Sequence, residues 1–280
     1  MNLHSAVRPP KPPLDRYIEV FWYQRIPIYS AREIILPSPH IELIINFGDP
    51  HKVFTSEDLD EFDWHADFWL AGLQSRWFGI ESTTSHMIGA RLKPGGAAAL
   101  LGGDISQFTD QVAPRDQILG DQAPELRGSL LAADEDEARF DMLEGFLRDR
   151  LDASRPGLDL ALEAVARLEA AVGDLSIADL AVGLEVRHKH LIEVCTRTIG
   201  LRPKQFARVL RFASVLPQLM AGDAPDWAAL AQAAGYHDQS HFNREFQKFA
   251  GLSPSQYLAL RAHYNQDYTE GDDTRFVPLG

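Results

Sequence analysis

Residues 235–257 read GYHDQSHFNREFQKFAGLSPSQY, and this stretch decides the fold of the second half of the chain. Asp238 stands just before a run with helical spacing, where its carboxylate can accept a backbone N–H of the first turn. Phe242 and Phe246 are four residues apart, so both lie on one buried face of that helix. Gly251 can adopt the left-handed conformation that ends a helix. The stretch therefore predicts a helix that begins after Asp238 and ends before Gly251.

The same pattern occurs twice, which predicts two helix-turn-helix units. In the second unit, Asp226 caps a helix that precedes the one just described, and Gly235 forms the turn between them. A further helix starts at Ser253, with proline at its first position. In the first unit, Ser176 caps one helix and Gly200 ends the next.

A long helix over Pro203–Met220 can link the two units, because its apolar residues recur with helical spacing. We expect Pro217 to kink or end it early, since proline removes a backbone donor and clashes with the preceding turn. A linker at 153–157 precedes the helical half. We therefore predict an all-α domain over 157–265, followed by a loose tail over 266–280.

The stretch from Gly235 to Tyr257 closely resembles the second helix-turn-helix of AraC/XylS-type transcriptional regulators. Nearly all positions of the family pattern are filled, although Gln247 stands where a basic residue is usual and Lys248 follows it. The resemblance covers roughly residues 159–262. It implies two units that enter successive major grooves on one face of double-stranded DNA, about 34 Å apart.

The face of this helix opposite the two phenylalanines carries the polar side chains suited to reading bases. Arginine pairs with guanine, asparagine and glutamine pair with adenine, and serine can contact either base. We predict base contacts from Gln239, Ser240, Asn243 and Arg244. Arg244 contacting a phosphate instead, or being a solvated surface residue, are the alternatives.

The first unit departs from the family pattern. Glu185 stands where glycine is usual in the turn, and Arg187 stands where a serine cap is usual. Its outward positions, which the resemblance assigns to base reading, are His188, Lys189 and Ile192, with Glu193 beside them. Isoleucine can contact only a thymine methyl, and a glutamate meets cytosine or is repelled by phosphate. This unit therefore either reads an unusual half-site or binds more weakly.

Basic residues of the helical half are candidates for phosphate contacts. Arg202 is the best placed, because it stands at a helix start beside free backbone N–H groups. The full set of candidates is Arg187, Arg197, Arg202, Lys204, Arg208 and Lys248.

The sequence pattern of the first half predicts a small antiparallel barrel or sandwich. We therefore expect the chain as a whole to be a two-domain α+β protein. Short β-rich runs alternate with turn residues over 17–23, 34–36, 40–47, 67–73, 77–80 and 86–92. A short helix is expected over 97–101. We place this domain at residues 1–153.

A helix over 134–151 ends the N-terminal domain and carries one apolar stripe. Phe140, Leu143 and Leu147 belong to that stripe, together with Phe146 and Leu151. The stripe packs either on its own barrel or against a second copy of the chain, as a homodimer through 134–151.

Residues 36–49 and 89–96 resemble the small, cupin-like N-terminal domain found on a subset of these regulators. The resemblance implies a sensing or dimerisation domain with no common effector. On a strand, His40, Glu42 and Asn46 share one face. They are candidates for a pocket that takes a small-molecule effector, with a metal site and purely structural polar residues as the alternatives.

Composition excludes several classes of protein. The start of the chain has no apolar core of a signal peptide, no run of 18 apolar residues occurs, and a single cysteine excludes a disulfide framework. We expect a cytoplasmic protein with no membrane partner, no cofactor and no metal. The net charge is −13, but residues 157–265 hold 11 basic and 11 acidic residues. DNA affinity must then come from where the cations lie.

The alternative class is an enzyme or DNA-repair protein that carries an AraC-type DNA-binding module. Such repair proteins need a methyl-accepting cysteine and zinc-binding cysteines in the N-terminal part, and residues 1–194 contain none. Catalytic sequence motifs are also lacking. We therefore predict a regulator and not an enzyme; it contacts RNA polymerase if it is an activator.

Overall fold

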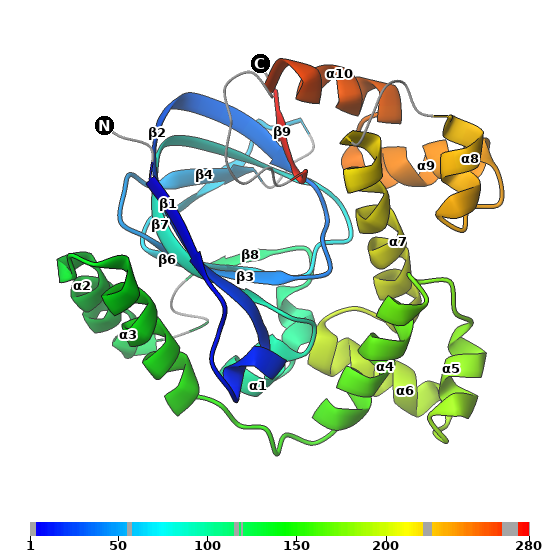
Figure 1. The fold of residues 1–280 in the computed structure, drawn as a ribbon, viewed down its shortest axis with the longest axis horizontal. Helices are drawn as coiled ribbons and strands as arrows, with labels where there is room; N and C mark the ends of the chain where they lie inside the picture. Colours follow the sequence, from blue (N-terminus) through cyan, green and yellow to red (C-terminus); the bar gives the residue numbers. More distant parts are fainter. Residues whose placement is uncertain are drawn as a thin grey trace.

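The computed structural model describes residues 4–54, 58–114, 118, 120–220, 226–264 and 274–279. Figure 1 shows a sheet-rich N-terminal part beside a helical C-terminal part. The predicted two-domain α+β class is thus confirmed, with an antiparallel β domain followed by an all-α domain. Among the described residues, no helix has the length and apolarity needed to cross a membrane.

The N-terminal domain is built on an antiparallel sheet that has nine strands within the described ranges. The order of hydrogen-bonded strands is β1-β2-β7-β3-β6-β8, with β4, β5 and β9 branching from that path. The two longest strands, β2 and β7, are neighbours in this order. The strands are β1 (His4–Arg8), β2 (Ile18–Ile35), β3 (Ile41–Asn46), β4 (His51–Phe54), β5 (Phe62–His65), β6 (Phe68–Ala71), β7 (Phe78–Leu92), β8 (Val112–Pro114) and β9 (Phe276–Pro278).

Strands β2 and β7 are longer than the sequence predicts. The runs expected as separate strands at 17–23 and 34–36 belong to one strand, and those at 77–80 and 86–92 belong to another. The two strands pair along most of their length, with a register shift between Pro27 and Ala31. One end of β7 then pairs with β3 and the other with β4, so the sheet can curl around its interior.

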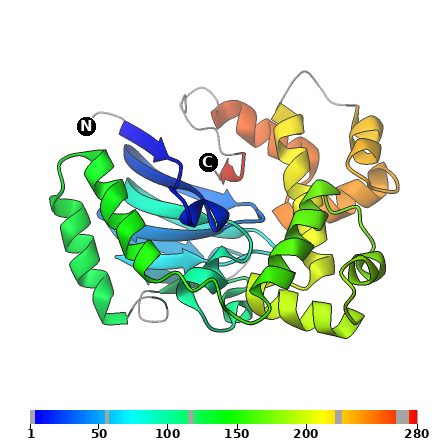
Figure 2. The ribbon, with the colours of Figure 1, turned by 60° about the horizontal axis from the view of Figure 1, so that its bottom comes forward.

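The α-helices of this domain, among the residues that the structure describes, are α1 (Gly96–Leu101), α2 (Ala123–Ala132) and α3 (Asp136–Asp149). Short 3-10 helices lie at Leu14–Arg16, Ile105–Phe108 (η2) and Gly120–Gln122. Figure 2 shows α2 and α3 side by side along one side of the sheet, away from the helical domain.

The apolar stripe of α3 packs on its own domain. Phe140, Leu143 and Leu147 are almost completely buried, and the Phe140 ring lies 6.5 Å from that of Phe21 on β2. These three residues are therefore not available to a second copy of the chain, which corrects the alternative of a homodimer through this stripe. The physical reason is that the sheet needs the same apolar surface to cover its outer face.

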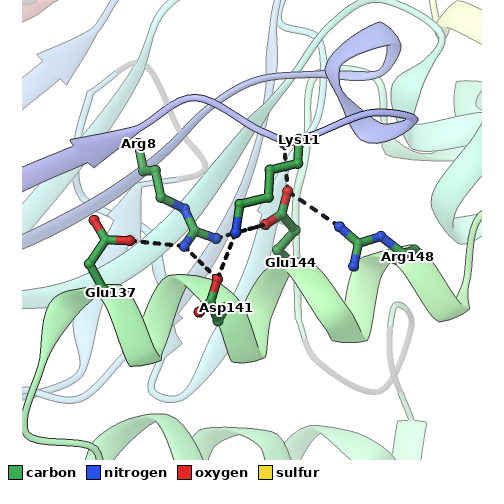
Figure 3. A network of polar contacts seen from close by, with 6 residues as sticks. All are labelled: Arg8, Lys11, Glu137, Asp141, Glu144 and Arg148. Atoms are coloured by element: carbon green, nitrogen blue, oxygen red, sulfur yellow. Dashed lines mark hydrogen bonds and ion pairs between the residues drawn. The ribbon is translucent and has the colours of Figure 1, made fainter.

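Ion pairs reinforce the packing of α3 against the first strand (Figure 3). Arg8 donates to Glu144 at 2.8 Å and to Asp141 at 2.7 Å, and it reaches Glu137 at 3.1 Å. The backbone N–H of Lys11 donates to Glu144 at 2.6 Å. Because Glu144 is only 2% exposed, its charge depends on these partners.

The helical domain contains the two predicted helix-turn-helix units and the helix that links them. In Figure 1, α7 runs between the second unit at one end and the first at the other. Its helices are α4 (Leu158–Ala170), α5 (Ile177–Gly183), α6 (His188–Ile199), α7 (Pro203–Met220), α8 (Trp227–Ala233), α9 (Gln239–Ala250) and α10 (Pro254–Tyr264).

The linking helix does not end at Pro217, so of the two expected effects of this proline an early end of the helix is wrong. Helix α7 continues to Met220 with this proline inside it, and the proline itself is exposed. Val215, Leu216 and Leu219 are buried around it. Burial of these apolar side chains holds the last turn in place despite the missing backbone donor.

The tail expected to be loose contains a strand. Residues 276–278 form β9, which pairs with β2, and Val277 is fully buried. Tyr257 of α10 donates to the Thr274 carbonyl at 2.8 Å. The tail thus gains backbone hydrogen bonds that its composition does not reveal, while residues 265–273 lie outside the described part of the chain.

Candidate nucleic-acid interface

The second unit forms as its capping residues predict. Asp226 accepts from the backbone N–H groups of Ala228 and Ala229, which begins α8. Gly235 has a φ of +73°, and this left-handed conformation turns the chain between α8 and α9. Asp238 then accepts the His241 backbone N–H at 2.7 Å, and this hydrogen bond holds the pKa of that carboxyl below its usual range.

The inner face of α9 is held by aromatic packing. Phe242 and Phe246 are fully buried. The Phe246 ring contacts Phe212 of α7 at 5.3 Å and Tyr257 of α10 at 5.7 Å, between ring centroids. Aromatic pairs at these separations add to the burial energy and fix the orientation of the rings. The rotation of α9 about its axis is therefore set by its neighbours.

The outer face of α9 is consequently presented to solvent. The four residues predicted to read bases all lie on it and are all exposed: Gln239, Ser240, Asn243 and Arg244. Between the two faces, Glu245 accepts two hydrogen bonds from Arg208 of α7, at 2.7 and 2.9 Å. The Arg208 guanidinium thus holds α9 to the linking helix, and its expected phosphate contact stays a prediction.

The first unit has the same architecture but weaker local chemistry. Ser176 caps α5 by accepting the Asp179 backbone N–H at 3.3 Å. Glu185 occupies the turn with a φ of +55°, a conformation that costs a residue with a Cβ about 1–2 kcal/mol. Arg187 stands at the N-cap of α6 and makes no side-chain capping hydrogen bond there. A glycine in the turn would avoid this strain, and a serine at the N-cap could accept a capping hydrogen bond.

The outward positions of α6 are less polar than those of α9. His188 and Lys189 are exposed, whereas Ile192 is half-buried. The Lys189 Nζ lies 3.7 Å from the Glu193 carboxylate, which partly neutralises its charge at this face. Three of the remaining phosphate candidates in this part of the domain are exposed, namely Arg187, Arg202 and Lys204, as is Lys248 on α9. Arg197, also exposed, contacts the Pro156 carbonyl at 3.4 Å.

The three polar residues predicted to form an effector pocket are already engaged within the protein. His40 lies just before β3 and contacts Glu19 at 2.8 Å. Glu42 accepts from Trp22, Arg91 and Arg275. The Asn46 amide donates to the carbonyls of Gly48, Asp49 and Ala66, and so braces the turn after β3. Each of these three side chains thus has its own contacts within the described residues, and their role in an effector pocket stays a prediction.

A cavity of about 280 Å³ lies elsewhere in the domain, and we call it the junction cavity. Its walls come from β4, β5 and two loops, and the lining residues are Val53, Phe54, Asp63, His65, Gln74, residues 76–78 and residues 110–112. The predicted pocket residues His40, Glu42 and Asn46 are not among them. Within the described ranges, no group of three or more His, Cys, Asp or Glu residues could hold a metal ion.

Two contacts between the domains carry no local sequence signal. The Trp77 backbone N–H donates to the Phe249 carbonyl of α9 at 2.9 Å. The Thr109 hydroxyl donates to the Gly200 carbonyl at the end of α6. Both partners are carbonyl groups at helix C-termini, which lack partners within their own helix. Only the tertiary fold places these loop residues there.

The single cysteine gives no support to a nucleophilic role. Cys195 is fully buried on α6, and burial raises the pKa of its thiol to about 12. A thiol with so high a pKa holds almost no thiolate at neutral pH, and the thiolate is the nucleophile. The methyl-accepting cysteine of the alternative class is therefore not found at this position.

Comparison with known proteins identifies a domain in each half of the chain. Residues 6–114 match a family described as a domain of unknown function, DUF6597. Residues 180–259 match a family described as a helix-turn-helix domain. No curated protein matches the chain.

Solved structures with a similar arrangement include two of ToxT from Vibrio cholerae. The structure with bound unsaturated fatty acid, from strain SCE256, is 14% identical and covers 85% of this chain and 94% of its own, with a TM-score of 0.48. That from O395 is 13% identical and covers 92% and 97%, with a TM-score of 0.45. The C-terminal domain of AraT, a response regulator from Geobacillus stearothermophilus, is 22% identical over 44% of this chain and 98% of its own, with a TM-score of 0.35.

The family match spans most of both units, and within it lie the capped, glycine-turned helix pairs and the motif of residues 235–257. Residues 180–259 therefore form a helix-turn-helix domain, on which the family match and the geometry of the two units agree.

Proposed function

We propose that the chain is a sequence-specific DNA-binding transcription regulator in which α9 is the principal reader of bases. One observation carries the proposal: the inner face of α9 is fixed by aromatic packing, and four polar side chains lie together on its outer face. Arg244 suits the O6 and N7 atoms of guanine, and Asn243 and Gln239 suit adenine. A rigid helix that presents such groups can discriminate bases in a major groove.

Helix α6 acts in this proposal as a second reader with a smaller share of the specificity. His188 and Lys189 are free to approach base edges, and Ile192 can contact a thymine methyl. The nearby Glu193 repels phosphate and competes for Lys189. The two half-sites should therefore contribute unequally to binding.

Phosphate contacts come from the exposed cations Arg187, Arg202, Lys204 and Lys248. Because the helical domain has no net charge, these contacts must offset the repulsion between an acidic protein and DNA. Each contact releases counterions, so affinity should fall steeply as salt is raised.

The N-terminal domain serves in this proposal as the regulatory part, over 1–153, and the helical domain over 157–265 binds DNA. Regulation by a small molecule fits the contacts that join the sheet to the ends of α6 and α9. A dimer, if it forms, must use surface other than the buried stripe of α3. RNA polymerase is the expected partner if the protein activates transcription.

Selection of bound sequences from a randomised DNA library tests the proposal with the full chain. We expect one preferred site from the wild type. Asn243→Ala and Arg244→Ala should each weaken binding to that site by about 1–3 kcal/mol and relax preference at one position. Arg25→Ala removes the same charge from an exposed position on β2 and is the matched control, which should keep the preference.

Two outcomes would contradict the assignment. Wild-type protein that enriches no sequence would exclude sequence-specific binding. A preferred site that both variants on α9 bind with unchanged affinity and preference would exclude this helix as the reader, even if the protein still bound DNA.

A further inference from the structure

The junction cavity is lined by the two loops through which the sheet contacts the DNA-binding domain. One wall is the loop that contains Gln74 and Trp77, and a second wall beside it is the segment that begins at Asp110. A volume of about 280 Å³ is close to the lower limit of pockets that take small organic ligands. A ligand in the cavity would therefore touch both loops.

Each wall contacts the C-terminal end of one recognition helix. Trp77 donates its backbone N–H to Phe249, and its indole ring covers Gly251, where a Cβ would lie 2.3 Å from Nε1. Thr109, the residue before the other wall, donates to the Gly200 carbonyl. A movement of these two adjoining walls would thus reach α9 and α6 together.

Hydrogen bonds join the two walls directly. Asp110 accepts from the backbone N–H of Ser75 at 2.5 Å and from its hydroxyl at 2.7 Å. Gln74 also donates to the Gln111 carbonyl at 3.0 Å. Asp110 has a φ of +56°, a left-handed conformation that is uncommon for a residue with a side chain. The loops are therefore connected through a strained residue that itself lines the cavity.

The lining indicates the chemistry of a ligand. Phe54, Trp77 and Phe78 provide aromatic surface, and polar groups come from His65 and from Asp63, Gln74, Arg76, Asp110 and Gln111. His65 is 5% exposed, and its Nδ1 has no hydrogen-bond partner within the residues that the structure describes. Burial lowers the pKa of His65, so the ring is neutral and does not attract an anion. A buried polar atom without a partner costs free energy that a ligand can recover.

We propose that the junction cavity is a regulatory site for a small uncharged aromatic molecule with a hydroxyl or amide group. The polar group of the ligand bonds His65, and its ring lies among the aromatic walls. Occupancy shifts the two loops and so changes how α6 and α9 are held relative to DNA. The proposal rests on the DNA-binding function proposed above and adds the place and the ligand class of its control.

Phenol and toluene are matched probes, because they differ by the hydroxyl group. Calorimetric titration of the full chain should give about tenfold tighter binding of phenol than of toluene, the effect of one hydrogen bond to a buried group. In His65→Phe the two affinities should become equal, whereas His65→Gln should keep the preference. If His65→Phe does not fold, Val112→Phe, which fills the cavity, should abolish binding of both probes.

Three results would overturn the site: no binding of phenol, equal binding of phenol and toluene by the wild type, or a preference that survives in His65→Phe or Val112→Phe. These titrations need no DNA. A chain that binds phenol as described but selects no DNA sequence would therefore contradict the proposed function and leave the site standing.

The coupling is tested on the selected DNA site. Saturating phenol should change the dissociation constant for DNA at least about fivefold in the wild type, the lower end of ordinary coupling between sites. Thr109→Val removes the hydrogen bond to Gly200 without altering the cavity lining. It should bind phenol normally and show a smaller effect on DNA. An unchanged DNA affinity in the wild type at saturating phenol would contradict the regulatory role.

Discussion

Glu185 is the residue at which the divergent sequence of the first helix-turn-helix unit strains the backbone. Its backbone is left-handed, with a φ of +55°, at the turn between α5 and α6. The second unit has Gly235 at its turn, with a φ of +73°. A glycine adopts this conformation without the clash that a Cβ causes. The two units therefore form similar turns, but the backbone of the first turn is strained and that of the second is not.

Replacing this glutamate by glycine should stabilise the protein. We expect Glu185→Gly to raise the free energy of unfolding by about 0.5–1 kcal/mol, because relief of strain exceeds the extra entropy of a glycine in the unfolded chain. Urea denaturation measures the change. Glu185→Ala is the control, since alanine keeps the Cβ. An equal gain in both variants would attribute the effect to the charge and not to the backbone.

At the scale of secondary-structure elements, α3 is joined to β1 by the ion-pair network of Figure 3. The Arg8 guanidinium lies over the Phe140 ring, 5.3 Å from its centroid, while it contacts three carboxylates of the same helix. Arg8 is 8% exposed and Glu144 is 2% exposed. The pair is thus buried, and removing one partner leaves the other charge poorly solvated.

Arg8→Ala should destabilise the N-terminal domain by about 3–5 kcal/mol, the range for breaking a buried pair. Lys11→Ala is the matched control, because its side chain is mostly exposed and a surface pair contributes about 0–1 kcal/mol. The double variant Arg8→Met/Glu144→Leu should recover most of the loss. Thermal or urea unfolding measures all three, and a loss of less than 1 kcal/mol in Arg8→Ala would show that the network does not anchor α3.

The elements that the sequence predicted well are those fixed by local chemistry. Helix α9 begins after its capping Asp238 and ends at Gly251, and Phe242 and Phe246 are buried as their spacing requires. Capping and helical periodicity act over a few residues, so they can be recognised without the rest of the fold.

The features that the sequence did not reveal depend on residues distant in the chain. Strand β9 exists because it pairs with β2, more than two hundred residues earlier. Glu42 and Asn46 alternate on a strand as a pocket would require, but their partners come from other segments. Trp77 lies over Gly251 only because two domains meet there. No local pattern encodes such contacts.

For the molecule as a whole, a buried histidine and a buried glutamate make opposite contributions to the pH dependence of the free energy of unfolding. Burial lowers the pKa of His51 to about 4, below its ordinary 6.5, and raises the pKa of Glu33 to about 7, above its ordinary 4.5. The stability linked to neutral His51 is present above pH 6.5 and is lost as the pH falls toward 4. The stability linked to protonated Glu33 is present below pH 4.5 and is lost as the pH rises toward 7.

These contributions should nearly cancel in the wild type between pH 4.5 and 6.5, so that its stability depends weakly on these two groups there. Glu33→Gln should expose the histidine contribution, with the free energy of unfolding falling as the pH is lowered, by up to about 1.4 kcal/mol per pH unit. His51→Gln should show the opposite slope. Urea unfolding at several pH values measures both, and parallel profiles for the wild type and both variants would contradict the assigned shifts.

In the proposed complex, two unequal helix-turn-helix units, joined by α7, read adjacent major grooves on one face of DNA. A methylation-interference footprint of the full chain on its selected site tests this arrangement, since it reports guanine contacts in the major groove. We expect two patches of interference about 10–10.5 base pairs apart on the same face, the stronger one lost in Arg244→Ala. Interference that is absent, confined to the opposite face, or unchanged in Arg244→Ala would contradict it.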